Sequence, residues 1–334
     1  MDTTFTDEQD LLRETARRMA ADLRAVPDEL ESQRGADKGL SLLTETGLYG
    51  MRLPESLGGS GAGAVDVAIV AEAFASTAAA VPFVGPAIAA DLLGRLDHGR
   101  VGALAEDPGR LTLALGEDFL PGSSARRIAW DSTYAKTALF VDDENGAYRV
   151  ERLPVDEEIA NADLSRSVHR ALPGDQLAEI GGEDFEAWLA FALACVSADL
   201  VGVMSGSLDL ALEHAKSRQQ FGRPLASFQA LQHRIADAYV LLQGARSGVL
   251  YAAWAVDNSS PSAALLAARV AKAYCAGAAL QVTETAMQIL GGMGITWESP
   301  SHLYLRRAYF DNVSFGDEQA QLAAIADERL GRAA

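Results

Sequence analysis

One segment of the chain gathers polar side chains around a glycine and a proline: residues Ser217 to Tyr239 read SRQQFGRPLASFQALQHRIADAY. A turn needs only the glycine and the proline, so the arginine and glutamine side chains need another reason. The guanidinium of Arg218 can make two parallel hydrogen bonds to phosphate oxygens. Together with the backbone of Gly222 near a helix end, Arg218 is therefore a candidate for binding a pyrophosphate.

The same residues also have a purely structural interpretation. A cation such as Arg218 stabilises the last turn of a helix, and Gly222 can end that helix. Ser227 is a good N-cap for the next helix, which would place Gln229 and His233 on its solvated face. Periodicity alone does not choose between the two interpretations.

A second loop offers similar chemistry, because residues Gln288 to Glu298 read QILGGMGITWE. The adjacent Gly291 and Gly292 would let a ligand approach the backbone closely, and the Gln288 amide can both donate and accept hydrogen bonds. A glycine pair alone also ends helices. Two such loops in one helical region indicate a nucleotide site more strongly than either loop does by itself.

The composition favours a mostly helical protein, because 49% of the 334 residues are hydrophobic, only 7% are aromatic, and alanine and leucine dominate. The formal net charge of −18 argues against nucleic acid and anionic membranes as partners, since the protein's field repels phosphates. A small anion could still bind where arginines cluster, at Arg218 with Arg223 and at Arg306 with Arg307.

The sequence also predicts a cytoplasmic location. No stretch is expected to be long and apolar enough to span a membrane, and the N-terminus lacks the order of a secretion signal. The two cysteines, Cys195 and Cys275, both lie in apolar runs. This favours reduced thiols over a disulfide or a metal site, and no metal ligands are expected.

Hydrophobic periodicity predicts three regions, and the fold class is mainly α with a small β domain. Region 1–105 is a helical domain that starts at a capping-box pattern, Thr6 with Gln9. Region 106–182 is a reduced β domain, because short β-branched runs alternate there with turn residues. Region 183–334 is a four-helix bundle. Its predicted helices cover about 185–217, 228–258, 261–290, 300–308 and 317–331.

These pieces closely resemble the acyl-CoA dehydrogenase family. The resemblance rests on the two C-terminal loops, the second continuing as ESPSHLYLRRA, and on the N-terminal runs FTDEQDLLRETARRMA and ETGLYGMRLPESLGGSG. It implies the order of helical, β and helical domains. It also implies FAD as cofactor, α,β-dehydrogenation of an acyl-CoA thioester, and electron transfer to an acceptor such as an electron-transfer flavoprotein.

The resemblance also implies which residues contact FAD. In this family the first two motifs reach FAD across a subunit interface, and a short third motif follows the position of the catalytic base. The matching cofactor-binding positions here are Arg218, Phe221, Gln229, Gln288, Gly291, Gly292 and Gln319.

Two features of the family are missing. No tract like T-E-P-x-x-G-S-D, which lines the flavin ring in the family, occurs between Leu111 and Ile180, where FLPGSSARRIAWD is at best a remnant. The family base is a carboxylate that takes the α-proton of the thioester. Its two known positions correspond to Phe315 and Ala192, and neither side chain can accept a proton.

Three functions remain open, and the missing features favour the first. The chain resembles the smaller subunit of actinobacterial steroid side-chain dehydrogenases, which pairs with a larger, base-bearing paralogue in an α2β2 heterotetramer. Alternatively, it is a self-sufficient homomer in which Asp317 or Glu318 has become the base, although both acids can equally be the polar start of a tail helix. The third possibility is a flavin-free scaffold.

Overall fold

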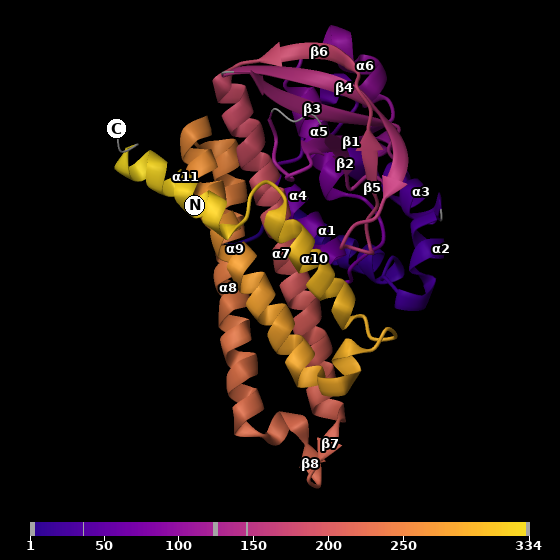
Figure 1. The fold of residues 1–334 in the computed structure, drawn as a ribbon, viewed down its shortest axis with the longest axis vertical. Coiled ribbons are helices and arrows are strands. Elements are labelled where there is room, and N and C mark those ends of the chain that lie inside the picture. The colour runs from indigo at the N-terminus through magenta and orange to yellow at the C-terminus, as the bar shows by residue number, and fades with distance from the viewer. Residues whose placement is uncertain (1–3, 36, 123–125, 145, 332–334) are drawn as a thin grey trace.

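The computed structural model describes residues 4–331 except 36, 123–125 and 145. One small β sheet lies at one end of the molecule, and a long helical bundle extends away from that sheet (Figure 1). The predicted fold class is confirmed. The boundaries proposed after residues 105 and 182 stay predictions, since one hydrophobic core runs through all three regions.

The first N-terminal helix begins where the sequence indicates. At the start of α1 (Asp7–Asp22) the hydroxyl of Thr6 accepts from the Gln9 N–H, and the Gln9 side chain accepts from the Thr6 N–H, so the capping box is confirmed. The alanine-rich α4 and α5 are almost completely buried and form the centre of this region. The remaining bounds are α2 (Leu30–Gly35), α3 (Asp37–Glu45), α4 (Ala64–Ala75), α5 (Val84–Gly94) and α6 (His98–Ala105).

The β strands form a closed sheet. Because β3 pairs with β1 on one side and with β4 on the other, β1 to β5 close on themselves, and β6 adds to β4. Closure leaves few free strand edges. The strands are β1 (Leu111–Gly116), β2 (Arg127–Trp130), β3 (Thr137–Glu144), β4 (Ala147–Ile159), β5 (Val168–Ala171) and β6 (Asp175–Ile180).

The C-terminal region is a bundle built around α7 and α9. Helix α9 starts at a Ser260 cap followed by Pro261, and it ends at Gly291, whose positive φ of 63° suits glycine. The short link between α8 and α9 makes these helices antiparallel neighbours (Figure 1). The bounds are α7 (Gly182–Ser217), α8 (Gln229–Asn258), α9 (Pro261–Leu290), α10 (Ser301–Val313) and α11 (Glu318–Leu330).

The expectation that no stretch is long and apolar enough to span a membrane was wrong. Both α7 and the segment Pro261–Ile295 reach that length and apolarity. However, 94% of the apolar window of α7 and 61% of that of Pro261–Ile295 are buried inside the fold. Packing against the other helices accounts for their apolar character, as in the core helices of a bundle.

Candidate functional site

The first candidate loop is a tight β hairpin. Its two strands are β7 (Gln219–Gln220) and β8 (Arg223–Pro224), joined by Phe221 and Gly222. Both turn residues have positive φ, 54° and 76°, which is the type I′ pattern of two-residue hairpins. Glycine adopts this conformation freely, whereas phenylalanine rarely does. The turn therefore holds an aromatic side chain in an unusual, outward position.

The start of α8 differs from the prediction. Ser227 is not its N-cap, because α8 begins at Gln229 after Phe228 and has no side-chain cap. The chain first makes one 3-10 turn, η5 (Leu225–Ser227), and the Ser227 hydroxyl donates backward to the Pro224 carbonyl at 2.7 Å. The hydroxyl is thus used within the loop.

The predicted FAD contacts on this hairpin are exposed, although the Phe221 ring lies edge-on to that of Phe228, with ring centres 6.2 Å apart. Phe221 is 92% exposed, and Gln229 is exposed on the first turn of α8. The backbone of Arg218 caps α7, but its guanidinium has no hydrogen bond or ion pair with any residue that the structure describes. Arg223 differs, because its guanidinium lies 4.1 Å from the centre of the Phe228 ring. Arg218 is the more available cation of this pair.

The second candidate loop, η6 (Gly291–Ile295), leaves its backbone accessible. Gly291 and Gly292 are exposed, and a Cβ added to either would meet no atom within 4 Å. Gln288 is exposed in the last turn of α9. Large apolar side chains surround them, with Ile295 80% and Trp297 51% exposed. Exposed apolar groups around accessible backbone are typical of a surface that another molecule covers.

The two candidate loops lie at the same end of the bundle. A small core cluster joins them, in which Ala286 and Ile289 of α9 pack with Leu225, Ala226 and Leu231 next to the hairpin. Figure 1 shows this end projecting away from the β sheet. Six of the seven predicted FAD contacts therefore form one exposed surface.

Gln319 does not belong to this surface. It lies in the first turn of α11, beside Glu318, whose carboxylate is next to Gly277 in the middle of α9. Eleven residues of α9 separate Gly277 from Gln288, which is about 16 Å along a helix. Asp317 is the N-cap of α11, and its carboxylate accepts the Ala320 N–H at 2.9 Å.

The two positions of the family base are apolar and buried. Ala192 is fully buried in α7, and Phe315 is only 3% exposed. The Phe315 ring centre lies 6.2 Å from that of Trp130 and 6.3 Å from that of Trp188, and the Phe310 ring stacks parallel to that of Trp130. Aromatic rings thus fill the interior at the position where the family has its carboxylate.

Two residues that were not predicted hold the turn at Phe315. Lys272, fully buried, donates from Nζ to the carbonyls of Asn312 and Gly316 at 2.7 and 2.9 Å. Gln321 donates from Nε2 to the Phe315 carbonyl at 2.6 Å. Burial lowers the pKa of Lys272 to about 8. The sequence signal was a single lysine inside an apolar, alanine-rich run.

The second arginine cluster, Arg306 with Arg307, is not an anion site. Arg307 is buried and makes a two-point ion pair with Asp199, with distances of 2.8 and 2.7 Å. Arg166, also buried, bridges Asp199 at 2.7 Å and Asp311 at 2.6 Å. The guanidinium of Arg307 is therefore occupied within the fold. Only Arg306 is exposed.

The pKa values of two acids in this buried network shift in opposite directions. Burial alone would raise the pKa of Asp199, but the Arg166 and Arg307 guanidiniums outweigh it and lower that pKa. Burial, together with the charge of Asp199, raises the pKa of Asp311 well above its usual range, although Arg166 opposes this. The two guanidiniums therefore favour the ionised form of Asp199, whereas burial beside Asp199 disfavours the ionised form of Asp311.

A crevice of about 1080 Å³ opens between the sheet and α10. Ile128 and Val168 line it from the sheet, and Tyr309 and Phe310 line it from α10. Phe119, from the stretch that resembles a remnant of the flavin-lining tract, also lines it. Residues 123–125 of that stretch lie outside the described residues. The crevice is mainly apolar and lies next to the Phe315 turn.

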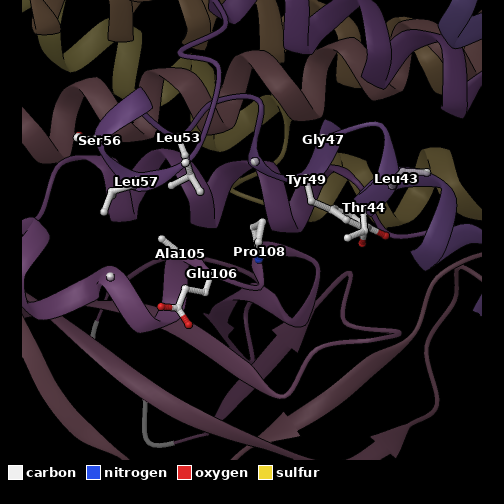
Figure 2. A pocket seen from close by; sticks show the side chains of 13 residues that line it. Leu43, Thr44, Gly47, Tyr49, Leu53, Ser56, Leu57, Ala105, Glu106 and Pro108 are labelled. Atoms are coloured by element: carbon white, nitrogen blue, oxygen red, sulfur yellow. The ribbon is translucent and has the colours of Figure 1, made fainter.

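A separate cavity of about 520 Å³ lies in the N-terminal region (Figure 2). Figure 2 shows Leu53 and Leu57 on one side of it and Ala105 and Glu106 on the other. Glu106 is the one charged side chain among its described lining residues. This cavity therefore adds no cluster of catalytic groups to the two candidate regions.

Comparisons with known proteins identify the helical regions at both ends of the chain. The profile of the acyl-CoA dehydrogenase N-terminal domain matches residues 6–96, and that of the C-terminal domain matches residues 185–330. The chain is 30% identical to acyl-CoA dehydrogenase IpdE2 of Mycolicibacterium smegmatis, over 97% of this chain and 99% of the relative. It is also 30% identical to IpdE2 of Mycobacterium tuberculosis, over 92% of each chain.

Solved structures share the fold. A chain of the ChsE4-ChsE5 complex from Mycobacterium tuberculosis superposes with a TM-score of 0.85 at 24% identity, covering 100% of both chains. A chain of the Tcur3481-Tcur3483 steroid ACAD has a TM-score of 0.83 at 24% identity, covering 96% of this chain and 97% of its own. The matched domains and the full-length relatives show that the chain belongs to the acyl-CoA dehydrogenase family, whose enzymes depend on FAD.

Proposed function

We propose that this chain is the shorter subunit of a heteromeric acyl-CoA dehydrogenase and completes the FAD site of a larger paralogue in an α2β2 heterotetramer. The substrate class is an acyl-CoA with a steroid side chain, the electron acceptor is an electron-transfer flavoprotein, and the location is cytoplasmic. Two structural relatives support the heteromer and the substrate class, since one is described as a complex of ChsE4 with ChsE5 and the other as a steroid ACAD.

The contrast between the two halves of the candidate site carries this proposal. The surface formed by the hairpin and η6 exposes Phe221, accessible glycine backbone and Arg218, whose guanidinium has no hydrogen bond or ion pair among the described residues. The base positions, Phe315 and Ala192, are instead buried and apolar. A chain that keeps the cofactor-facing surface but not the proton acceptor is suited to serve another subunit's site.

In this role each group has a specific task. Bound FAD supplies the acceptor for the hydride equivalent that leaves the substrate's β carbon. The Arg218 guanidinium would pair with the pyrophosphate, and its charge would be matched there by two negative oxygens. Gly291 and Gly292 would let the adenosine half approach the backbone, with the Gln288 amide at its edge. The α-proton would go to a carboxylate of the larger subunit.

The alternative of a self-sufficient enzyme depends on Asp317 or Glu318 as the base. Asp317 already accepts a hydrogen bond from Ala320 as the cap of α11, and Glu318 lies beside Gly277 on the outside of α9. Both side chains are exposed, whereas a base of this kind needs an apolar pocket that raises its pKa. The alternative of a flavin-free scaffold does not explain why Arg218 is exposed and has no ion pair among the described residues.

Substituting these two acids separates the first two functions. In the complex with the larger subunit, the double variant Asp317→Asn and Glu318→Gln keeps the side-chain shapes and removes the basic carboxylates. We expect its turnover to fall by far less than the roughly 10²–10⁴-fold that follows the loss of a general base. FAD content is measured in parallel. A thousandfold loss at full FAD occupancy would make one of these acids the base and overturn the subunit proposal.

A further inference from the structure

A groove of about 440 Å³ lies between α1, α4, α7 and α8, away from both candidate regions. Arg13 and Arg17 of α1 line it, as does Arg24 just beyond the end of α1. Residues spaced by four share one face of a helix, so Arg13 and Arg17 lie on the same wall, and Arg24 lines the groove beyond the helix end. Ala21 lies between the last two and leaves room for a ligand.

The opposite wall and the floor have a different character. Arg246 of α8 and Glu72 of α4 also line the groove, and they pair with each other at 2.7 Å. The floor is apolar and is formed by Ile69, Val249 and Leu250. A ligand in this groove would therefore have one charged end and one apolar end.

Pairing within the fold leaves two of the four arginines available. Arg13 pairs with Asp10 at 2.7 Å, and Arg246 pairs with Glu72. The guanidiniums of Arg17 and Arg24 have no hydrogen bond or ion pair with any residue that the structure describes. Asp209 is the remaining carboxylate that faces the groove, so the two free arginines still outnumber it.

This surplus of positive charge occurs on a protein whose formal net charge is −18. At about 0.1 M salt the field of distant charges is screened beyond about 10 Å, so the groups inside the groove decide what binds there. Guanidinium groups favour phosphate because they can donate two parallel hydrogen bonds to it.

We propose that this groove binds an organic phosphate, with the phosphate between Arg17 and Arg24 and an aliphatic part on Ile69, Val249 and Leu250. The site is separate from the FAD surface and does not depend on the subunit proposal. A membrane surface, unlike a small ligand, would also meet the charges outside the groove, and the formal net charge of −18 disfavours that contact, so the ligand is a free molecule and not a membrane lipid.

The test uses n-octyl phosphate as the probe, titrated calorimetrically into the full-length chain. We expect octyl phosphate to bind more tightly than inorganic phosphate, and n-octanol not to bind. Arg17→Gln and Arg24→Gln should each weaken the binding of octyl phosphate by about tenfold or more, which is the usual effect of losing a charge-assisted pair. Arg18→Gln is the matched control, because Arg18 is exposed on the same helix and donates to Thr15.

Three results would overturn the proposal. The first is no binding of octyl phosphate, and the second is equal binding by wild type and by the double variant Arg17→Gln with Arg24→Gln. The third is binding to vesicles that contain phosphatidic acid, which would make the groove a membrane contact. The substituted arginines are exposed, so the variants should stay folded, and thermal melting of each variant verifies this.

Discussion

Two regions of the C-terminal bundle differ in how their arginines are paired. At the end formed by the hairpin and η6, Arg218 points outward with no partner among the described residues, and Phe221 is 92% exposed. In the middle of α7, by contrast, the buried Asp199 pairs with Arg166 and Arg307, and Arg166 also pairs with Asp311. The exposed arginine is available to a ligand, whereas the buried arginines connect distant segments of the fold through ion pairs.

This difference shows what decides whether an arginine cluster can bind an anion. By sequence, Arg218 with Arg223 and Arg306 with Arg307 are equally good candidates for an anion site. The fold assigns Arg307 to an internal ion pair and leaves Arg218 free. Burial and pairing, and not the number of arginines, decide which cluster can bind a ligand.

The largest effect is expected for breaking the buried network. Arg307→Met leaves the Asp199 carboxylate with one of its two guanidinium partners, which should lower the free energy of unfolding by about 3–5 kcal/mol. The neighbouring Arg306→Met is the control, because Arg306 is exposed, and should change it by about 0.5 kcal/mol or less. Urea unfolding followed by circular dichroism measures both. Equal values for the two variants would mean that the network does not stabilise the fold.

A smaller effect is expected at the exposed end. Arg218→Gln removes a charge-assisted pair with the pyrophosphate worth about 1.5–3 kcal/mol, so FAD should bind about 10- to 150-fold more weakly to the heteromer. Lys216→Gln is the matched control, since Lys216 is also exposed but lies two residues earlier. Fluorescence of released FAD gives the affinity. If both variants kept wild-type FAD affinity, Arg218 would have only a helix-end role.

The smallest effect is expected for the pH dependence of stability, at a histidine outside both regions. Burial lowers the pKa of His169, whose Nδ1 lies 2.8 Å from the Ser132 hydroxyl. Between this lowered pKa and the unfolded value of about 6.5, the unfolded chain binds a proton that the folded chain does not. Stability should therefore fall as the pH drops below about 6.5, and less so in His169→Gln. If the free energy of unfolding changed with pH in the same way in the wild type and in His169→Gln, this prediction would be contradicted.

Much of the fold was predictable because the signals are local. The capping box of Thr6 and Gln9, the β-branched runs of the sheet and the long alanine-rich helices all follow from neighbouring residues. The start of α8 was mispredicted because Ser227 looks like an N-cap, but the hairpin geometry turns its hydroxyl toward Pro224. A competing local hydrogen bond decided that boundary.

The candidate site was only partly predictable, because its remaining parts depend on contacts between distant segments. Sequence motifs identified the residues of the exposed surface, but they could not show that Gln319 lies elsewhere, beside the middle of α9. They also could not pair Arg307 with Asp199, which is 108 residues away. The roles of Lys272 and Gln321 depend on the turn that follows α10, and no motif marks them.

The most direct test of the subunit proposal is the FAD content of this chain purified alone and with a larger paralogue. The chain alone should be colourless or hold far less than one FAD, because its sequence has no tract that would hold the flavin ring. The co-purified complex should be yellow, with fewer FAD molecules than subunits. A yellow homotetramer with one FAD per chain, its flavin rings in the crevice beside α10, would contradict the proposal.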